Sequence, residues 1–293
     1  MPAIDLSQLP APTVVEALDF ETILAAMRAD LQARWPEFSA AVESDPVMKV
    51  LEVAAYRELL LRQRVNDAAR GVLVATAAGA DLDNLGALLN VRRLVVTPAD
   101  PAANPPRAAV LEDDARFRQR IVLALEGYPT AGATGAYRFH ALSATADVKD
   151  VAVRSPYPGK VRVVVLSRAV GGAADAALLA TVQAALSDEK VRPLTDSVEV
   201  VSAAVVPYRV TATLHVQPGP DALVVKRAAE EAVAAYVAGR HAIGAGVAVS
   251  GLLAALHQPG CRTVRLAEPA ADLEVGPDSA PFCEAVTITV EEG

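Results

Sequence analysis

Residues 46–78 read PVMKVLEVAAYRELLLRQRVNDAARGVLVATAA, the longest helical pattern in the chain. Apolar or small side chains recur along it at alternating spacings of four and three residues, which is a heptad pattern. Asp45 is suited to cap the helix, Pro46 to its first turn and Gly79 to its end. At about 1.5 Å per residue, this predicts one helix about 50 Å long. The heptad positions form a seam of Val47, Leu51, Ala54, Glu58, Leu61, Val65, Ala68, Val72 and Ala75.

A second apolar stripe runs beside the seam, so the helix is apolar around more than half of its circumference. The pattern leaves two interpretations open: a central helix in a monomeric bundle, or a helix shared between chains. Small alanines on the seam favour the shared helix because they allow close approach. The polar Glu58 is suited to set the register against a basic partner. The second stripe contains Val50, Val53, Leu59 and Leu60.

The composition excludes several classes of protein. The 293 residues suffice for two or three domains, and their cores must be built from Ala, Val and Leu because only 4% of residues are aromatic. A net charge of −8 without a basic block argues against nucleic acid as a partner. No stretch approaches 18 uncharged apolar residues, and the first 20 residues lack a basic cluster, so we expect neither membrane insertion nor a secretory signal. In a cytoplasm, Cys261 and Cys283 are expected to stay reduced.

Helical patterns come first along the chain and strand patterns later, which is typical of an α+β fold. A proline-containing arm precedes a helix from Asp19 to about Arg34, and the stretch TPADPAANPPR at residues 97–107 is expected to be a linker. We therefore expect an N-terminal long-helix bundle segment followed by small α+β domains with mixed or antiparallel sheets. The expected domains are residues 1–97 (arm and core-bundle helices), 98–204 (central) and 205–293 (C-terminal).

Beyond residue 107, helical patterns at residues 112–127 and 133–144 are separated by a turn rich in Gly and Thr. VKDVAV and KVRVVVLS then flank the turn PYPG and predict a hairpin. Residues 208–216 alternate strictly between apolar and polar side chains, which indicates a strand buried on one face. Further helices are expected at residues 175–186, at 221–238 and after Ser250, and further strands at residues 197–201, 262–266 and 285–290.

The sequence contains no organised set of catalytic residues. The four histidines are scattered, and none has a Ser or Cys nearby in a nucleophile arrangement. His257 and Cys261 have a spacing that metal ligands use, but two residues do not make a zinc site. Gly244, Gly246 and Gly251 follow a helix rather than a strand, so we expect a turn there and no dinucleotide loop. We therefore predict no catalytic, cofactor-binding or metal-binding residues and a protein that is not an enzyme.

Several segments resemble the baseplate J-like proteins of contractile phage tails. They include IDLSQLPAP, LDFETILA, the run SDPVMKVLEVAAYRELLLRQRVNDAARGVLVA and ADLDNLGALLNVRRLVV. EDDARFRQRI, TAGATGAYRFHALS, VKDVAV, PYPGKVRVVVLS and VRPLTDSVEV follow in the family's order. The resemblance covers essentially the whole chain and is strongest up to residue 96 and in these central segments.

The resemblance implies structural work in the baseplate of a phage or tailocin, assembled in the bacterial host cytoplasm. Two copies of such a subunit and one smaller tail protein, similar to tail protein I, form a heterotrimeric wedge. Six wedges surround the hub and rearrange when the sheath contracts. Further implied partners are the hub and a lysozyme-like baseplate protein that initiates the sheath. The predicted interface contains the seam residues from Leu51 to Val72 and, by resemblance, Tyr56, Arg57, Gln63, Arg64, Asn66 and Asp67.

Two other functions compete with this interpretation. One is a homo-oligomeric adaptor of another secretion or injection machine, which would bind no smaller tail protein. The other is an enzyme with a site assembled in the C-terminal domains, around His257 and Cys261. The absence of a nucleophile, a metal set or a phosphate loop in the sequence argues against the enzyme.

Overall fold

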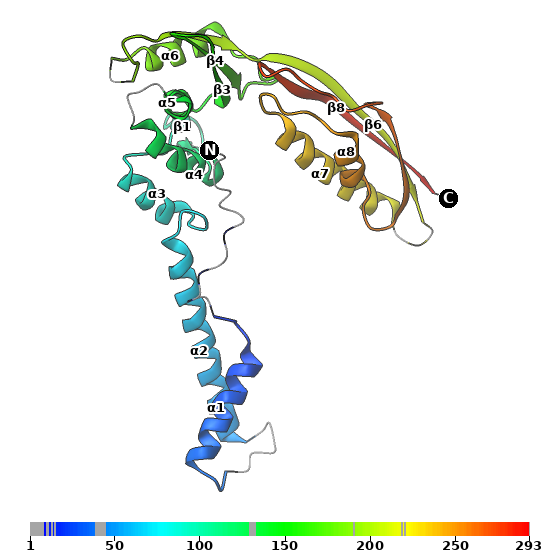
Figure 1. Ribbon diagram of the computed structural model, residues 1–293. Helices are drawn as coiled ribbons and strands as arrows, with labels where there is room; N and C mark the ends of the chain where they lie inside the picture. The colour runs from blue at the N-terminus through cyan, green and yellow to red at the C-terminus, as the bar shows by residue number, and fades with distance from the viewer. Residues whose placement is uncertain are drawn as a thin grey trace. The chain divides into compact units, whose positions relative to one another are not determined.

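The computed structural model describes residues 9, 12, 14, 16–38, 45–128, 133–189, 191–217, 219 and 221–292. Most of the expected N-terminal arm, and the expected turn at residues 129–132, lie outside the described residues. The chain forms two compact units, Met1–Arg92 with Asp113–Arg118, and Arg93–Glu112 with Gln119–Gly293. Helices build the first unit, and small mixed or antiparallel sheets with helices build the second (Figure 1). The α+β class expected from the sequence is confirmed.

The first unit is built on a helical hairpin of α1 (Phe20–Arg34) and α2 (Pro46–Gly71). The side chain of Asp19 accepts backbone N–H bonds in the first turn of α1, and that of Asp45 does so in α2. Both predicted helix starts are confirmed. The two helices bury a small apolar cluster of Phe38 and Met48, with Leu31, Val47 and Leu51 packed against it.

α2 ends at Gly71, whereas the sequence pattern predicted a helix to Ala78. Turns occupy residues 72–78, and α3 (Gly79–Leu88) follows. A Cβ atom at Gly71 would lie 2.9 Å from the Asp81 carboxylate, so a glycine allows α3 to approach the end of α2. The prediction that the long helix continues to Ala78 is therefore wrong.

Contacts from elsewhere in the first unit stabilise the turns after α2. The Arg118 guanidinium donates to the carbonyls of Val74 and Ala77, both at 2.6 Å. The Thr76 hydroxyl donates to the carbonyl of Arg70 at 2.7 Å. These carbonyls thus have partners without a continuing helix.

The proline-rich stretch expected to be a linker belongs to a small hairpin. β1 (Val95–Thr97) pairs antiparallel with β2 (Val110–Leu111). Asp100 and Arg107 exchange two backbone hydrogen bonds of 2.9 Å beyond the strands. Prolines fit here because they lie in the turn, where no ladder N–H is required. The linker prediction for residues 97–107 is therefore wrong.

The central module (residues 133–202) contains a three-stranded sheet in the order β3-β4-β5. β3 and β4 form the predicted antiparallel hairpin, and β4 pairs parallel with β5 through the crossover helix α6. Side chains of α5 and α6 pack into the core with one face of this sheet. The bounds are α5 (Thr134–Ala144), β3 (Val148–Tyr157), β4 (Lys160–Ser167), α6 (Ala176–Leu186) and β5 (Ser197–Ser202); α4 (Asp114–Leu123) and η2 (Ala124–Gly127) precede them.

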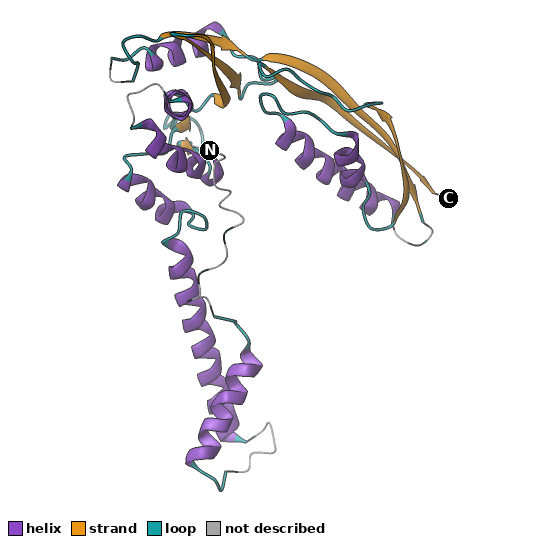
Figure 2. Ribbon diagram, viewed as in Figure 1, coloured by secondary structure: helices purple, strands orange, loops and turns teal. Residues whose placement is uncertain are grey.

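The C-terminal module (residues 204–292) has a second sheet in the order β7-β6-β8. β6 (Ala204–Val216) pairs antiparallel with β7 (Cys261–Glu268) and parallel with β8 (Ser279–Glu292). α7 (Ala222–Arg240) and α8 (Val249–Leu256) cover one face of the sheet (Figure 2). The predicted alternation is confirmed, since Tyr208, Val210, Ala212, Leu214 and Val216 are all buried.

The two modules of the second unit are joined by direct contacts. One residue, Ala203, separates β5 from β6, and its N–H donates to the carbonyl of Val165 at 2.8 Å. The Asp150 carboxylate in β3 accepts the backbone N–H of Ile243 at 3.0 Å. A small core of Val164, Leu166, Ala203 and Ala280 contains residues of both modules.

Candidate assembly interface

An apolar strip on α2 lies exposed to solvent. Val50 is 67% exposed, Val53 62%, Leu61 64% and Val65 49%, and Val72 just beyond the helix is 68% exposed. Single exposed apolar residues are normal on a protein surface, but a row of them at helical spacing is not. Such a row is typical of a helix that packs against another chain.

The strip lies to one side of the face that packs against α1. Met48 and Ala55 are buried and Leu51 is half-buried on the side where α1 packs. At 100° per residue, the exposed strip is centred roughly 120° around α2 from that side. Within the first unit, α1 therefore leaves this strip uncovered.

The polar residues of α2 have partners inside the chain. Arg62 Nε donates to the Glu58 carboxylate at 2.9 Å, and another nitrogen of the same guanidinium lies 3.1 Å from Glu16. Asn66 is 2% exposed, and its amide accepts the Glu16 N–H at 2.9 Å and donates to the Glu16 carbonyl at 2.8 Å. These contacts attach the segment before α1 to the C-terminal half of α2. The charge of Glu58 is thus balanced by Arg62 in the same chain, without a basic residue from a partner.

The predicted interface residues occupy α2 but do not share one face. Leu51 and Glu58 are half-buried and Asn66 is buried. Val50 and Val53 belong to the strip, yet they were absent from the predicted set, although the second apolar stripe was their signal. The exposed members of the predicted set are Ala54, Tyr56, Arg57, Leu61, Gln63, Arg64, Val65, Asp67, Ala68 and Val72.

A second exposed apolar surface lies on the β1–β2 hairpin. Its four large apolar side chains are 39–53% exposed, namely Val95, Val96, Val110 and Leu111. The sequence interpretation missed them because it assigned this region to a linker. An isolated two-stranded hairpin is marginally stable in water, so this surface is suited to contact a partner.

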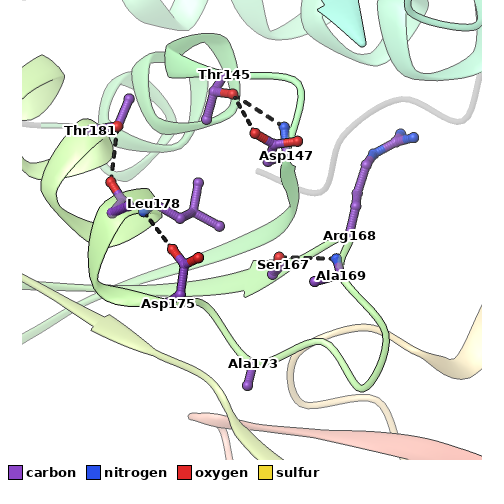
Figure 3. A pocket seen from close by; sticks show the side chains of 10 residues that line it. Thr145, Asp147, Ser167, Arg168, Ala169, Ala173, Asp175, Leu178 and Thr181 are labelled. Carbon is purple, nitrogen blue, oxygen red and sulfur yellow. Dashed lines mark hydrogen bonds between the residues drawn. The ribbon is translucent and has the colours of Figure 1, made fainter. Parts of the chain in front are cut away.

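A pocket of 490 Å³ lies in the central module, where β4 ends and α6 begins (Figure 3). Asp175 caps α6 by accepting the Leu178 N–H at 2.8 Å, and the Thr145 hydroxyl donates to the Asp147 carboxylate at 3.2 Å. Ser167 accepts the Ala169 N–H at 3.0 Å. These polar groups hold backbone turns and a helix end. Their arrangement presents no paired nucleophile and base.

Within the described ranges, no group of three or more His, Cys, Asp or Glu residues is arranged to hold a metal ion. Both cysteines are free thiols. The Cys261 thiol donates to the carbonyl of Thr263 at 3.3 Å, and burial raises the pKa of both thiols. Cys261 thus acts as a small buried side chain, without the low pKa of a reactive cysteine. None of the helices described is long and apolar enough to cross a membrane.

Comparison with known proteins relates the chain to phage baseplates. Three family domains match in order: the baseplate J-like N-terminal domain at residues 43–100, the central domain at 129–202 and the C-terminal domain at 208–289. Baseplate protein J of Escherichia phage P2 is 48% identical over 290 residues, and the match covers 97% of this chain and 96% of that protein.

A solved structure, the cryo-EM structure of the anti-feeding prophage (AFP) baseplate, 6-fold symmetrised, contains a chain of 12% sequence identity and TM-score 0.33. That match covers 93% of this chain, which spans about half (54%) of the other. The three domain matches and the P2 relative establish the family. The three matched domains correspond in order to the segment that contains α2, the central module and the C-terminal module. The chain belongs to the baseplate J-like family.

Proposed function

We propose that this chain is the larger subunit of a heterotrimeric baseplate wedge, in which two copies associate with one smaller tail protein. Membership of the family makes the chain a structural protein of a phage-type baseplate, and therefore part of the tail particle. The observation that carries the finer proposal is the exposed apolar strip of α2. Its side chains are exposed and outside the cluster that packs against α1, so they are accessible to helices of other chains.

In this proposal, residues 1–97 form the core-bundle part, and the interface includes the predicted residues of α2 together with Val50 and Val53. Six wedges surround the hub, and the chain also meets the lysozyme-like baseplate protein that initiates the sheath. The domains at residues 98–204 and 205–293 supply contacts between neighbouring wedges, which rearrange on contraction. The chain performs this work without catalysis.

Co-expression tests the stoichiometry. The full-length chain and the small tail protein of the same particle should co-purify as a complex with two copies of this chain and one of the partner, measured by native mass spectrometry. Leu61→Asp should abolish this complex because it places an unpaired charge in an apolar contact, at a cost of several kcal/mol. The variant itself should fold normally, since Leu61 is 64% exposed in the chain alone.

Leu194→Asp is the matched control, because Leu194 is 98% exposed and belongs to the second unit and not to α2. It should leave the complex intact. A monodisperse monomer that ignores the small protein would refute the wedge proposal. A stable homo-oligomer that ignores it would instead support the adaptor function.

A further inference from the structure

The sheet of the C-terminal module ends in two open edges. Among the residues that the structure describes, β7 and β8 are the outer strands and no fourth strand pairs with either. Residues 285–290 of β8 read AVTITV, without a charge, a proline or a glycine. Folded proteins usually protect exposed edges with charges, prolines or bulges. An unprotected edge of this length is therefore suited to pair with another strand.

The two edges differ in net charge. Glu284 and Glu291 flank the unprotected stretch of β8, and both are exposed. Arg262 and Arg265 lie exposed on β7, which also carries Glu268 at its end. Two β8 edges would bring acids together, whereas β8 against β7 places Glu291 near Arg265. The charges therefore favour a second copy of this chain, docked through its β7 edge.

We propose that β8 of one copy pairs antiparallel with β7 of a second copy of this chain, so that the sheet continues across the contact. β8 runs parallel to β6 and β7 runs antiparallel to it. A second sheet placed alongside, with its helices on the same face, therefore brings β7 antiparallel to β8. The contact is heterologous, and such contacts build a ring when the rotation closes. This inference rests on the proposed function, for which it specifies the contact between neighbouring copies.

A sheet that continues across the contact at the same level has a defined register. Leu214 of β6 lies between Val264 and Val290. If the two sheets are aligned so that equivalent residues of β6 are level, Val290 lies opposite Val264 of the second copy. By the same rule, Ile288 lies opposite Leu266 of the second copy, because both flank Ala212. Both apolar pairs fall on the face that the helices cover, as a packed sheet requires.

The opposite face of the continued sheet is polar. Thr213 pairs with Arg265 on one side and with Thr289 on the other, so Thr289 lies opposite Arg265 of the second copy. Glu291 is then the diagonal neighbour of that arginine, within reach of a long side chain. Apolar and charged positions thus agree on one register.

Cysteine cross-linking tests this register. Thr211 pairs with both Glu268 and Thr287, so these two residues oppose each other across the proposed contact. Opposed Cβ atoms lie about 4.5–5.5 Å apart, within reach of a disulfide once the side chains adjust. Full-length Thr287→Cys and Glu268→Cys chains with different tags, co-expressed, purified together and oxidised in air, should form a mixed disulfide. Wild-type chains, which carry only Cys261 and Cys283, are the control and should not.

This cysteine pair leaves Arg265 and Glu291 in place. Adding Arg265→Glu to the Glu268→Cys chain should lower the yield of mixed disulfide several-fold. Arg227→Glu, the same charge change at an exposed position on α7, should not. A disulfide between two Thr287→Cys chains would show a two-fold β8–β8 contact and overturn the proposal, as would the absence of any mixed disulfide.

The complex with the small tail protein separates the two proposals. If that complex forms but the mixed disulfide does not, this inference fails and the wedge stands. If the disulfide forms but the complex does not, the wedge proposal fails and the edge contact stands. If neither forms, both fail.

Discussion

At the scale of single residues, the buried ion pair between Glu112 and Arg120 is a contact whose loss should strongly lower the free energy of unfolding. Their side chains are 0% and 5% exposed, and the oxygen and nitrogen lie 2.6 Å apart. Glu112→Ala leaves the guanidinium buried without this partner, so we expect a loss of about 3–5 kcal/mol in unfolding free energy. Urea unfolding of the full chain measures it. Asp30→Ala, which removes an exposed pair with Arg34, should have no measurable effect; equal effects of the two changes would contradict the argument.

A second residue-scale contact makes stability depend on pH. Lys149 Nζ lies 2.8 Å from Nδ1 of His241, so the imidazole must be neutral to accept this hydrogen bond. Burial, and secondarily the charge of Lys149, lowers the pKa of His241 below its ordinary 6.5. Asp150 in β3 also lies beside this site, because it accepts the N–H of Ile243. Burial, and secondarily the charge of Arg168, lowers the pKa of Lys149 itself.

The sign follows from proton uptake. As the pH falls below 6.5, the unfolded chain protonates His241 while the folded chain resists, so the folded state loses stability. His241→Gln keeps a hydrogen-bond acceptor and removes the titration. Between pH 7.5 and 5.5, wild-type protein should lose about 2–4 °C more in Tm than this variant, a shift typical of a modest contribution in a chain of this size. Parallel Tm curves for the two proteins would exclude the effect.

At the scale of elements, local signals predicted starts and periods better than ends. Asp19 and Asp45 mark the starts of α1 and α2 in the sequence, because a capping side chain accepts backbone N–H bonds from the first turn of the same helix. The end of α2 depends on Arg118, more than forty residues along the chain, which no local pattern contains. The β1–β2 hairpin was missed for the same reason, since its short strands are identified only by their pairing.

The interface could be predicted only in part. Periodicity identified α2 as apolar around much of its circumference, and the exposed strip agrees with that pattern. Periodicity does not say which face α1 covers, so Val50 and Val53 were left out and Asn66, which binds Glu16, was included. The open edges of β7 and β8 could not be predicted from local patterns, because the order of strands in a sheet depends on long-range pairing.

At the scale of the whole molecule, the central and C-terminal modules should unfold together, because they share strand connections, a small core and the Asp150–Ile243 hydrogen bond. Asp150→Ala leaves the Ile243 N–H without this acceptor and also removes the 3.3 Å ion pair with Arg138, and it should cost about 1–3 kcal/mol. Hydrogen exchange of the full chain should then accelerate in β3–β5 and in β6–β8 by similar factors. Asp147→Ala is the matched control, since this exposed carboxylate accepts from Thr145 in the same module.

The result shows whether a force applied to the C-terminal module also acts on the central module of the second unit. If exchange accelerates in both modules after Asp150→Ala, the pair behaves as one cooperative body, and a strand docked on β8 is held by the central module as well. If exchange accelerates only in β6–β8, the C-terminal module opens alone and a rearrangement on contraction can take place at the Ala203 junction. The first outcome is expected, because Val164 and Leu166 of β4 are fully buried in the core that Ala280 of β8 completes.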